Sequence, residues 1–286
     1  MPEFLLEPVA DESLQHFENE CIKYQRQLGP VANLPTNLYE RFVALFDETP
    51  GWFYHESAAI WDTFLSYQEV TNNVGNIMEI GVYQGKSAGM LALHRRGEES
   101  CVLVDVTPLH QVRQRIEQAV PGAKCEYLQE MSQFLMRHPF VREAARDFRW
   151  IHIDGEHSAQ AVSNDLALAE TLLSDRGIIV LDDFFSPHYP QITQALFRFL
   201  DANPGRLMLI LCGFNKGYLC RPRAAHEYLT FMRSSLFANL ARRGCGKRVT
   251  ICKTTAPADM NAFGIIERYN DMDYRGPDWD IANIAI

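Results

Sequence analysis

Two patterns of apolar residues alternate along the middle of the chain, from residue 76 to about residue 222. Short runs of mostly apolar residues, such as 77–82 and 178–181, are typical of strands that are buried on both sides of a parallel sheet. The longer segments between these runs carry apolar residues at helical spacing. Strands that alternate with helices predict a parallel sheet with helices on both faces, which is an α/β fold.

The same patterns divide the chain into three segments. Residues 1–70 carry mainly helical patterns broken by prolines, and they predict a helical N-terminal segment. Residues 71–222 hold the alternating strands and helices of the predicted core. Residues 223–286 combine a helical pattern with two strand patterns, and we expect this extension to serve as a lid or a dimer contact. Its basic run, residues 242–248, is expected to be a solvated turn.

The core ends in a predicted hairpin. Apolar runs at residues 207–211 and 218–220 flank Phe-Asn-Lys-Gly at residues 214–217, a sequence typical of a tight connection between two strands. The last two strands of the core are therefore expected to pair antiparallel.

Composition limits the class of partner. The chain has 286 residues, of which 47% are hydrophobic, and this is ample for a large core. Its formal net charge of -9 argues against a broad nucleic-acid surface or an anionic membrane as partner. A small-molecule substrate is favoured, while homo-oligomerisation is left open.

The cysteines and the N-terminus indicate a cytoplasmic protein. Seven cysteines are scattered without a CxxC pair, as is typical of reduced thiols. The N-terminus lacks a basic region followed by an apolar one, and nowhere do 18 apolar residues run together. We expect the protein to be neither secreted nor membrane-spanning.

A glycine-containing turn follows the first strand of the core. Gly81 and Gly85 permit a tight turn and a close approach of backbone to a ligand, and Lys86 and Ser87 open a helix whose free amides favour electron-rich groups. Glu79 interrupts the strand itself, and because an unpaired buried carboxylate is costly, a polar partner is expected there.

The spacing of this turn excludes two common nucleotide motifs. It lacks a glycine of the dinucleotide pattern G-x-G-x-x-G, and its glycines are one residue too close for a P-loop. The pattern E-x-G-x-x-x-G resembles the first motif of class I methyltransferases, which bind S-adenosylmethionine. An ordinary strand, turn and helix with an isolated glutamate is the alternative.

Asp105 ends the next predicted strand, 20 residues after Gly85. Doubly wound folds use an acidic residue at this place to bind ribose hydroxyls. The alternative role is to cap the helix that starts near Pro108.

Carboxylates also end two later strands of the core. Asp154 follows one apolar run, and Asp182 and Asp183 follow another. Three carboxylates at one sheet edge repel one another unless a cation or a proton intervenes, and hard oxygen ligands suit magnesium, calcium or manganese. In the alternative, one of the adjacent aspartates caps the next helix and the other faces solvent.

His157 follows Asp154 by three residues, which places an imidazole beside the predicted cation. A neutral imidazole can accept a proton from a substrate hydroxyl near pH 7. We expect His157 to be the catalytic base, and Asp154 is the competing base. In the alternative, His157 is only a residue at the start of a helix and has no catalytic role.

Residues 78–87 (MEIGVYQGKS) and 151–184 together resemble class I methyltransferases of the macrocin O-methyltransferase and cephalosporin-hydroxylase type, relatives of metal-dependent catechol-type O-methyltransferases. The resemblance covers residues 75–222. It implies a Rossmann-like, seven-stranded, mostly parallel sheet with an antiparallel last strand, and the predicted hairpin agrees with this. It also implies bound S-adenosylmethionine, a hydroxyl acceptor on a sugar or other natural product, a base at His157, and a divalent cation, commonly magnesium, at Asp154, Asp182 and Asp183.

The resulting prediction is an S-adenosylmethionine-dependent O-methyltransferase for a small molecule. In the resembling family a turn near Ser132 lies beside the adenine, although only Ser132 matches it here. The expected donor-binding residues are Glu79, Gly81, Gly85, Ser87, Asp105, Ser132 and Asp154.

Two other functions remain open. One is an NAD-dependent oxidoreductase on a similar fold, against which the missing glycine counts. The other is a catalytically silent methyltransferase-like protein that binds a partner.

Overall fold

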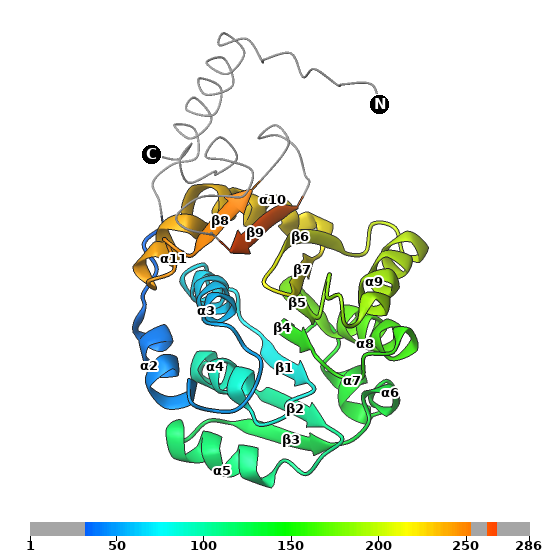
Figure 1. The fold of residues 1–286 in the computed structure, drawn as a ribbon. Helices are drawn as coiled ribbons and strands as arrows, with labels where there is room; N and C mark the ends of the chain where they lie inside the picture. Colours follow the sequence, from blue (N-terminus) through cyan, green and yellow to red (C-terminus); the bar gives the residue numbers. More distant parts are fainter. Residues whose placement is uncertain (1–31, 253–261, 268–286) are drawn as a thin grey trace, which may run out of the picture.

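The computed structural model describes residues 32–252 and 262–267. Within these residues one nine-stranded sheet forms the centre of the molecule, with the strand order β3-β2-β1-β4-β5-β7-β6-β9-β8 (Figure 1). Strands β1 to β5 pair parallel, and β7 lies antiparallel between β5 and β6. The strands are β1 Asn76–Ile80, β2 Cys101–Asp105, β3 Cys125–Gln129, β4 Phe148–Ile153, β5 Leu173–Asp182, β6 Met208–Gly213, β7 Lys216–Cys220, β8 Val249–Cys252 and β9 Phe263–Glu267.

Helices cover both faces of the sheet because the strand side chains point alternately to either side. Ile77 and Trp150 pack into one hydrophobic cluster with residues of α2 to α5, α10 and α11, whereas Met78 and Ile151 pack into a second cluster with α6 to α9. The helices are α2 Asn37–Phe46, α3 His55–Val70, α4 Lys86–His94, α5 His110–Ala119, α6 Ser132–Leu135, α7 Pro139–Glu143, α8 Ala159–Leu172, α9 Pro190–Ala202, α10 Pro222–Phe231, the π-helical turn η1 Met232–Leu236 and α11 Phe237–Arg242.

The predicted α/β class and the antiparallel strand at the end of the core are confirmed. The strand count differs, because the extension adds two strands to the expected seven. Strand β9 pairs parallel with β6, and β8 pairs antiparallel with β9. The sequence indicates strands in this segment, but their attachment to the sheet depends on contacts between distant residues.

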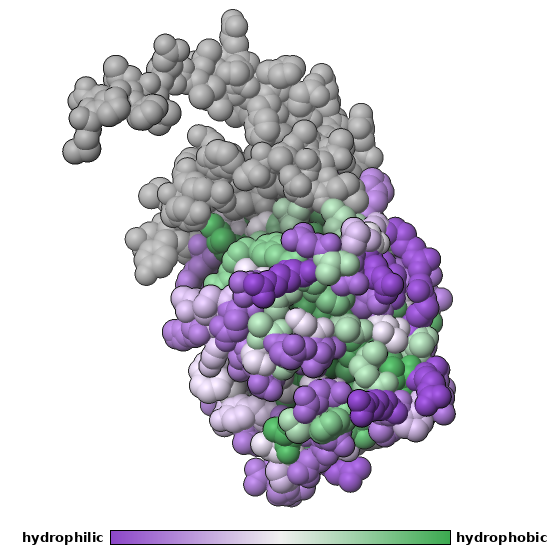
Figure 2. Space-filling model, turned by 90° about the vertical axis from the view of Figure 1, so that its right-hand side faces the viewer, coloured by the Kyte–Doolittle hydropathy of each residue, from purple (hydrophilic) through white to green (hydrophobic). Residues whose placement is uncertain are grey.

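The described part of the N-terminal segment is helical, as expected, and packs into the same core as the sheet. Phe42 of α2 and Trp61 of α3 are buried in the cluster that also holds Leu240 of α11. Residues 1–31, 253–261 and 268–286 lie outside the described residues, and the lid or dimer role of the extension and the three-segment division stay predictions. Hydrophilic and hydrophobic residues are interspersed on the face shown in Figure 2.

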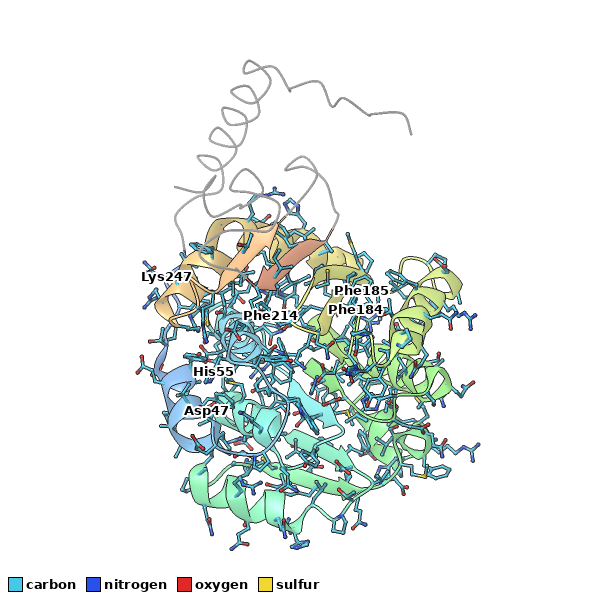
Figure 3. All side chains as sticks on the ribbon, viewed as in Figure 1. Asp47, His55, Phe184, Phe185, Phe214 and Lys247 are labelled. Carbon is cyan, nitrogen blue, oxygen red and sulfur yellow. The ribbon has the colours of Figure 1, made fainter. Side chains whose placement is uncertain are left out.

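A group of charged residues, which we call the closed cluster, joins α3, α4 and the end of α11, and all but the half-buried Glu69 are buried. It consists of Asp62, Glu69, His94 and Arg243. His94 Nδ1 lies 2.8 Å from Glu69 Oε1, and His94 Nε2 lies 2.9 Å from Asp62 Oδ1. Arg243 Nε donates to Asp62 Oδ2 at 2.5 Å. Arg243 was expected in a solvated turn and is buried, while Lys247 of the same run is exposed (Figure 3).

Among the described residues, none of the helices combines the length and apolar character needed to cross a bilayer.

Candidate functional site: a cleft at the carboxyl ends of the strands

The turn after β1 lies directly against the end of β4. Gly81 has a φ of 84°, and a Cβ at this position would lie 1.8 Å from the backbone oxygen of Asp154. Gly85, with a φ of 82°, is the N-cap of α4, and its Cβ would meet Val112 at 2.7 Å. Both positions therefore require glycine, because a side chain would be strained and would collide with a neighbouring element.

Asp105 turns its carboxylate toward this glycine turn. Its Oδ2 accepts hydrogen bonds from the backbone nitrogens of Val82 and Tyr83, at 2.8 and 2.9 Å, and its Oδ1 accepts from Thr107. Burial raises the pKa of Asp105, but these hydrogen bonds outweigh it and leave the pKa below its ordinary value. The helix-cap alternative is wrong, since Leu109 is the N-cap of α5.

Two adjoining cavities open at this edge of the sheet, of about 1170 and 430 Å³. Gly81, Asp105 and Asp154 line both of them, so the two cavities are neighbours, and together we call them the cleft. Ser87 lines the larger cavity, and Ser132 lines the smaller one.

Aromatic side chains from separate segments form the walls of the larger cavity. Trp52, before α3, stacks on Tyr83 of the glycine turn with ring centroids 5.9 Å apart. Phe185 and Phe214, both labelled in Figure 3, also line this cavity. Several non-glycine residues of this lining have a positive φ, which is a strained backbone that often accompanies binding sites: Tyr83, Asp183, Phe185, Phe214 and Asn215.

Four charged side chains of alternating sign lie on four neighbouring strands, one on each, at the floor of the cleft. This charged row consists of Glu79 on β1, His152 on β4, Asp182 on β5 and Lys216 on β7. Glu79 is the register partner of His152, and Asp182 is that of Lys216. His152 Nδ1 lies 2.7 Å from Glu79 Oε1, His152 Nε2 lies 3.6 Å from Asp182 Oδ2, and Lys216 Nζ lies 2.5 Å from the same oxygen.

The charges of the row stabilise one another. Burial lowers the pKa of His152, but the adjacent carboxylates of Asp182 and Glu79 outweigh this and raise the pKa to about 9. Burial raises the pKa of Asp182, and the Lys216 ammonium together with His152 more than reverses that effect, so the net pKa lies well below the ordinary value. His152 is therefore protonated and Asp182 ionised at neutral pH.

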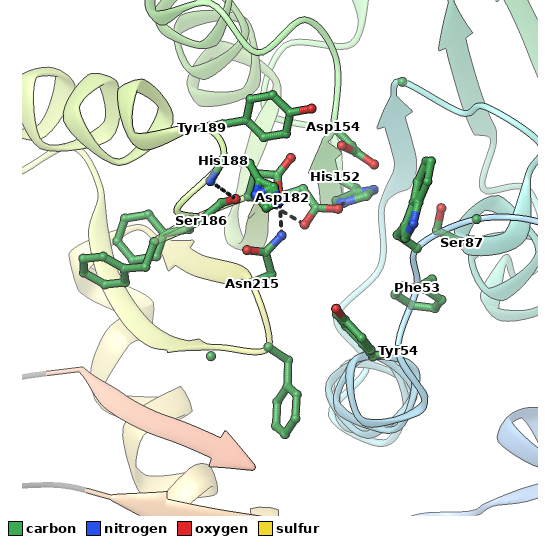
Figure 4. A pocket seen from close by; sticks show the side chains of 18 of the residues that line it. Phe53, Tyr54, Ser87, His152, Asp154, Asp182, Ser186, His188, Tyr189 and Asn215 are labelled. Carbon is green, nitrogen blue, oxygen red and sulfur yellow. Dashed lines mark hydrogen bonds and ion pairs between the residues drawn. The ribbon is translucent and has the colours of Figure 1, made fainter.

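A second group, open to the larger cavity, lies next to the row. His157 Nε2 is 3.0 Å from Asp183 Oδ2 and 3.9 Å from Asp154 Oδ1. The His157 ring stacks on Tyr189, with centroids 4.1 Å apart and planes 9° apart. The side-chain amide of Gln191 donates to the His157 backbone oxygen at 2.8 Å, so the start of α9 holds this histidine in place. Figure 4 shows Tyr189 and Asp154 facing the same space.

Asp154 differs from its acidic neighbours. Burial raises its pKa, and the negative charge of Asp182 raises it further, well above the ordinary value. Asp154 thus keeps its proton to a higher pH than Asp182 does.

The predicted metal ligands do not form one cage. Ligand atoms within 4.8 Å of one another fall into two groups, His152 with Asp154 and Asp182, and Asp154 with His157 and Asp183. Asp182 is already paired with Lys216. A single divalent cation held by the three aspartates does not fit this arrangement as it stands, and metal binding is not confirmed.

The matched family agrees with this geometry. Residues 78–184 match the model of the family described as "Methyltransferase domain". The match begins in β1 and ends just after Asp183, so it contains the glycine turn, Asp105 and His157. These residues are thus similar to a methyltransferase domain. The expected resemblance to class I methyltransferases is confirmed, over less than half of the chain.

Solved structures similar to this chain include several methyltransferases. CalS11, described as a TDP-rhamnose 3'-O-methyltransferase, is 16% identical, with a TM-score of 0.46 over 77% of this chain and 99% of that one. PaMTH1 from Podospora anserina is 19% identical, with a TM-score of 0.46 over 76% and 97%. MycE, in complex with Mg and SAH, is 17% identical, with a TM-score of 0.48 over 66% and 55%. These values are too low to support an argument about function.

None of the curated proteins matches the sequence.

The cleft at the carboxyl ends of the strands gathers most of the predicted donor residues. Gly81, Ser87, Asp105 and Asp154 line it, and Ser132 lies in its smaller part. Glu79 lies instead beneath the cleft, fully buried against His152, which is the polar partner expected for it. The individual roles of these residues in donor binding stay predictions.

Sequence reasoning missed two residues of the site, His152 and Lys216. His152 precedes Asp154 by two positions and so shares its face of the strand, which is a signal that could have been used. Lys216 was assigned only to the hairpin, because its pairing with Asp182 depends on the register of β5 and β7.

Proposed function

We propose that this protein is an S-adenosylmethionine-dependent O-methyltransferase that acts on a hydroxyl of a small molecule. One observation supports this proposal most strongly. The larger cavity extends from the glycine turn and Asp105 to His157, so a donor bound at the turn and a base beside the acceptor share one space. A methyltransferase domain over the same residues supplies the reaction class.

The donor would lie across the two cavities. The smaller cavity, with Met131, Ser132 and Gly155 in its wall, has the size and polarity for an adenine ring. Asp105, between the cavities, is placed to accept hydrogen bonds from ribose hydroxyls. The turn at Gly81 and the first amides of α4 would hold the amino-acid end. When bound, S-adenosylmethionine supplies an electrophilic methyl group on a sulfonium.

His157 is the base in this proposal. Its ring lines the larger cavity, and its Nε2 faces Asp183, which favours the protonated imidazole that forms when a hydroxyl loses its proton. Stacking on Tyr189 fixes the plane of the ring. Asp154, which lines both cavities, is the competing candidate.

The acceptor is a small molecule with an apolar or flat surface. The outer wall of the larger cavity presents Trp52, Tyr54, Phe185 and Phe214, onto which a sugar face or an aromatic ring can pack. A sugar or another natural product with a free hydroxyl fits this wall. No step above depends on a divalent cation, which stays a prediction for Asp154 and Asp183.

Calorimetric titration and methyl transfer test the proposal. S-adenosylmethionine should bind and NAD should not; the reverse would favour the oxidoreductase. With an acceptor found in a panel of glycosides and phenols, His157→Ala should lower turnover about 10²- to 10⁴-fold while donor affinity is unchanged. His188→Ala is the matched control, since His188 lines the same cavity but lies outside the group of Asp154, His157 and Asp183. Equal losses in both variants would remove His157 from the role of base.

A further inference from the structure

We propose that the ammonium of Lys216 takes the place of a divalent cation at Asp182, so that Asp182 is not a metal ligand in this protein. The inference deepens the proposed function, on which its catalytic meaning rests. It is carried by the charged row and by the hydrogen bonds of the two adjacent aspartates.

Asp182 already has a cationic partner. Lys216 Nζ lies 2.5 Å from Asp182 Oδ2. A divalent cation at Asp182 would lie next to this ammonium, which would repel it.

The carboxylate oxygens of the two aspartates are already used. Asp182 Oδ1 accepts from the backbone nitrogen of Asp183 at 2.8 Å, and its Oδ2 accepts from Lys216. Asp183 Oδ1 accepts from the side-chain amide of Asn215, and its Oδ2 faces His157. A hard cation at Asp182 would therefore have to displace Lys216 from its carboxylate.

Lys216 is poorly placed to move away. Its side chain is only 2% exposed, and besides Asp182 its ammonium has the rings of Phe53 and Trp61 within reach, at 5.7 and 5.8 Å from the ring centroids. Its backbone pairs with that of Asp182 across β5 and β7. Removing the carboxylate contact would strand a buried charge, which is unfavourable.

Lys216 is thus a positioning residue rather than a catalytic one. It fixes Asp182, whose Oδ1 holds the backbone of Asp183, and the adjacent Asn215 holds the Asp183 side chain. Asp183 in turn faces His157. The lysine and its neighbour in the hairpin thereby set the orientation of the acid that supports the proposed base.

Titration of the full-length protein with Mn²⁺, followed by the electron paramagnetic resonance of the free ion, tests this inference directly. In the wild type, Mn²⁺ binding should be the same as in Asp182→Asn. In Lys216→Met the unpaired Asp182 should be exposed to metal, and Mn²⁺ affinity should rise at least tenfold. Lys216→Arg keeps the charge and should resemble the wild type.

The control is Lys86→Met, which also removes a positive charge beside the cleft, where Lys86 lies 3.6 Å from Asp47. This variant should bind Mn²⁺ as the wild type does. Wild-type binding that is lost in Asp182→Asn would overturn the inference, as would an unchanged affinity in Lys216→Met that retains the wild-type circular dichroism spectrum. If Lys216→Met does not fold, the comparison of the wild type with Asp182→Asn decides.

The outcome is separate from that of the proposed function. S-adenosylmethionine affinity is measured on the same samples by calorimetry. If S-adenosylmethionine does not bind while Mn²⁺ binding in the variants is as expected, the methyltransferase proposal is rejected. The assignment of Lys216 is then unaffected.

Discussion

Two buried histidines of this protein lie in closely similar surroundings and have different consequences. His94 in the closed cluster and His152 in the charged row are both fully buried, and each imidazole lies between two carboxylates. For both, burial lowers the pKa, and the carboxylates outweigh it and raise it above the ordinary value. Local chemistry is therefore nearly the same.

The difference lies in where each series of charges ends. The closed cluster continues from His94 through Asp62 to Arg243, which is buried between α3 and α11. The charged row reaches Asp182, which lines the larger cavity. The closed cluster holds helices together, whereas the charged row positions Asp182, a side chain that lines the open cleft. A buried carboxylate–histidine pair is a site only when one of its members faces a cavity.

The largest expected effect comes from opening the closed cluster. Asp62→Ala leaves His94 and Arg243 without their shared carboxylate, and breaking a buried ion pair in this way costs about 3–5 kcal/mol of unfolding free energy. Denaturant unfolding measures this loss. Donor affinity, measured on the folded protein without denaturant, should stay as in the wild type. Weaker donor binding by the folded variant would show that the closed cluster also affects the cleft.

The pH dependence of stability sharpens the comparison. Because the folded-state pKa of His152 is about 9 and the unfolded value is about 6.5, its stabilisation is complete below pH 6.5 and is lost as the pH rises toward 9. This amounts to about 3 kcal/mol, and His94 adds to it in the same direction. Unfolding at pH 6.5 and pH 9 should show the loss. His152→Gln should reduce the difference between these two pH values, and an unchanged slope would mean that His152 is neutral in the folded protein.

Asp105→Ala tests the role of the cleft in donor binding. The donor should bind about ten- to a hundredfold more weakly, since charge-assisted hydrogen bonds contribute about 1.5–3 kcal/mol. Asp105 also holds the amides of Val82 and Tyr83, so Asp105→Asn, which keeps an acceptor oxygen, should recover part of the affinity. Normal donor binding by Asp105→Ala would refute the ribose assignment.

The smallest effect is expected from Tyr189→Ala. The stacked ring orients His157, and an aromatic pair of this kind contributes about 0.5–1.5 kcal/mol, which corresponds to a roughly three- to tenfold lower turnover. Donor affinity should not change. Tyr189→Phe keeps the ring and should restore turnover, and a low rate in both variants would point to the hydroxyl instead.

The parts of the site that the sequence predicts are local in the chain. The glycine turn could be recognised because Gly81 and Gly85 have the positive φ angles that glycine adopts most easily. The position of Asp154 at the end of a strand follows from one apolar run. Glu79 announces a polar partner because it interrupts an apolar strand. For these residues the pattern alone was enough to place them at one edge of the sheet.

The rest depends on register between distant segments. Lys216 pairs with Asp182 and Arg243 pairs with Asp62, and the partners are far apart in the chain. From residue type alone, both basic residues are expected at the surface. Likewise, the extension predicts strands but not the edge that receives them. The hydrogen bonds of Asp105 to backbone amides are set by side-chain orientation, which no sequence pattern specifies.

The contact of Gly81 with the Asp154 carbonyl has a consequence for engineering. Because there is no room for even a methyl group between the two, the loop after β1 and the loop after β4 keep a fixed spacing. An attempt to alter acceptor choice by grafting a foreign loop after β4 must therefore preserve the backbone path at residue 154, or import both loops as a pair.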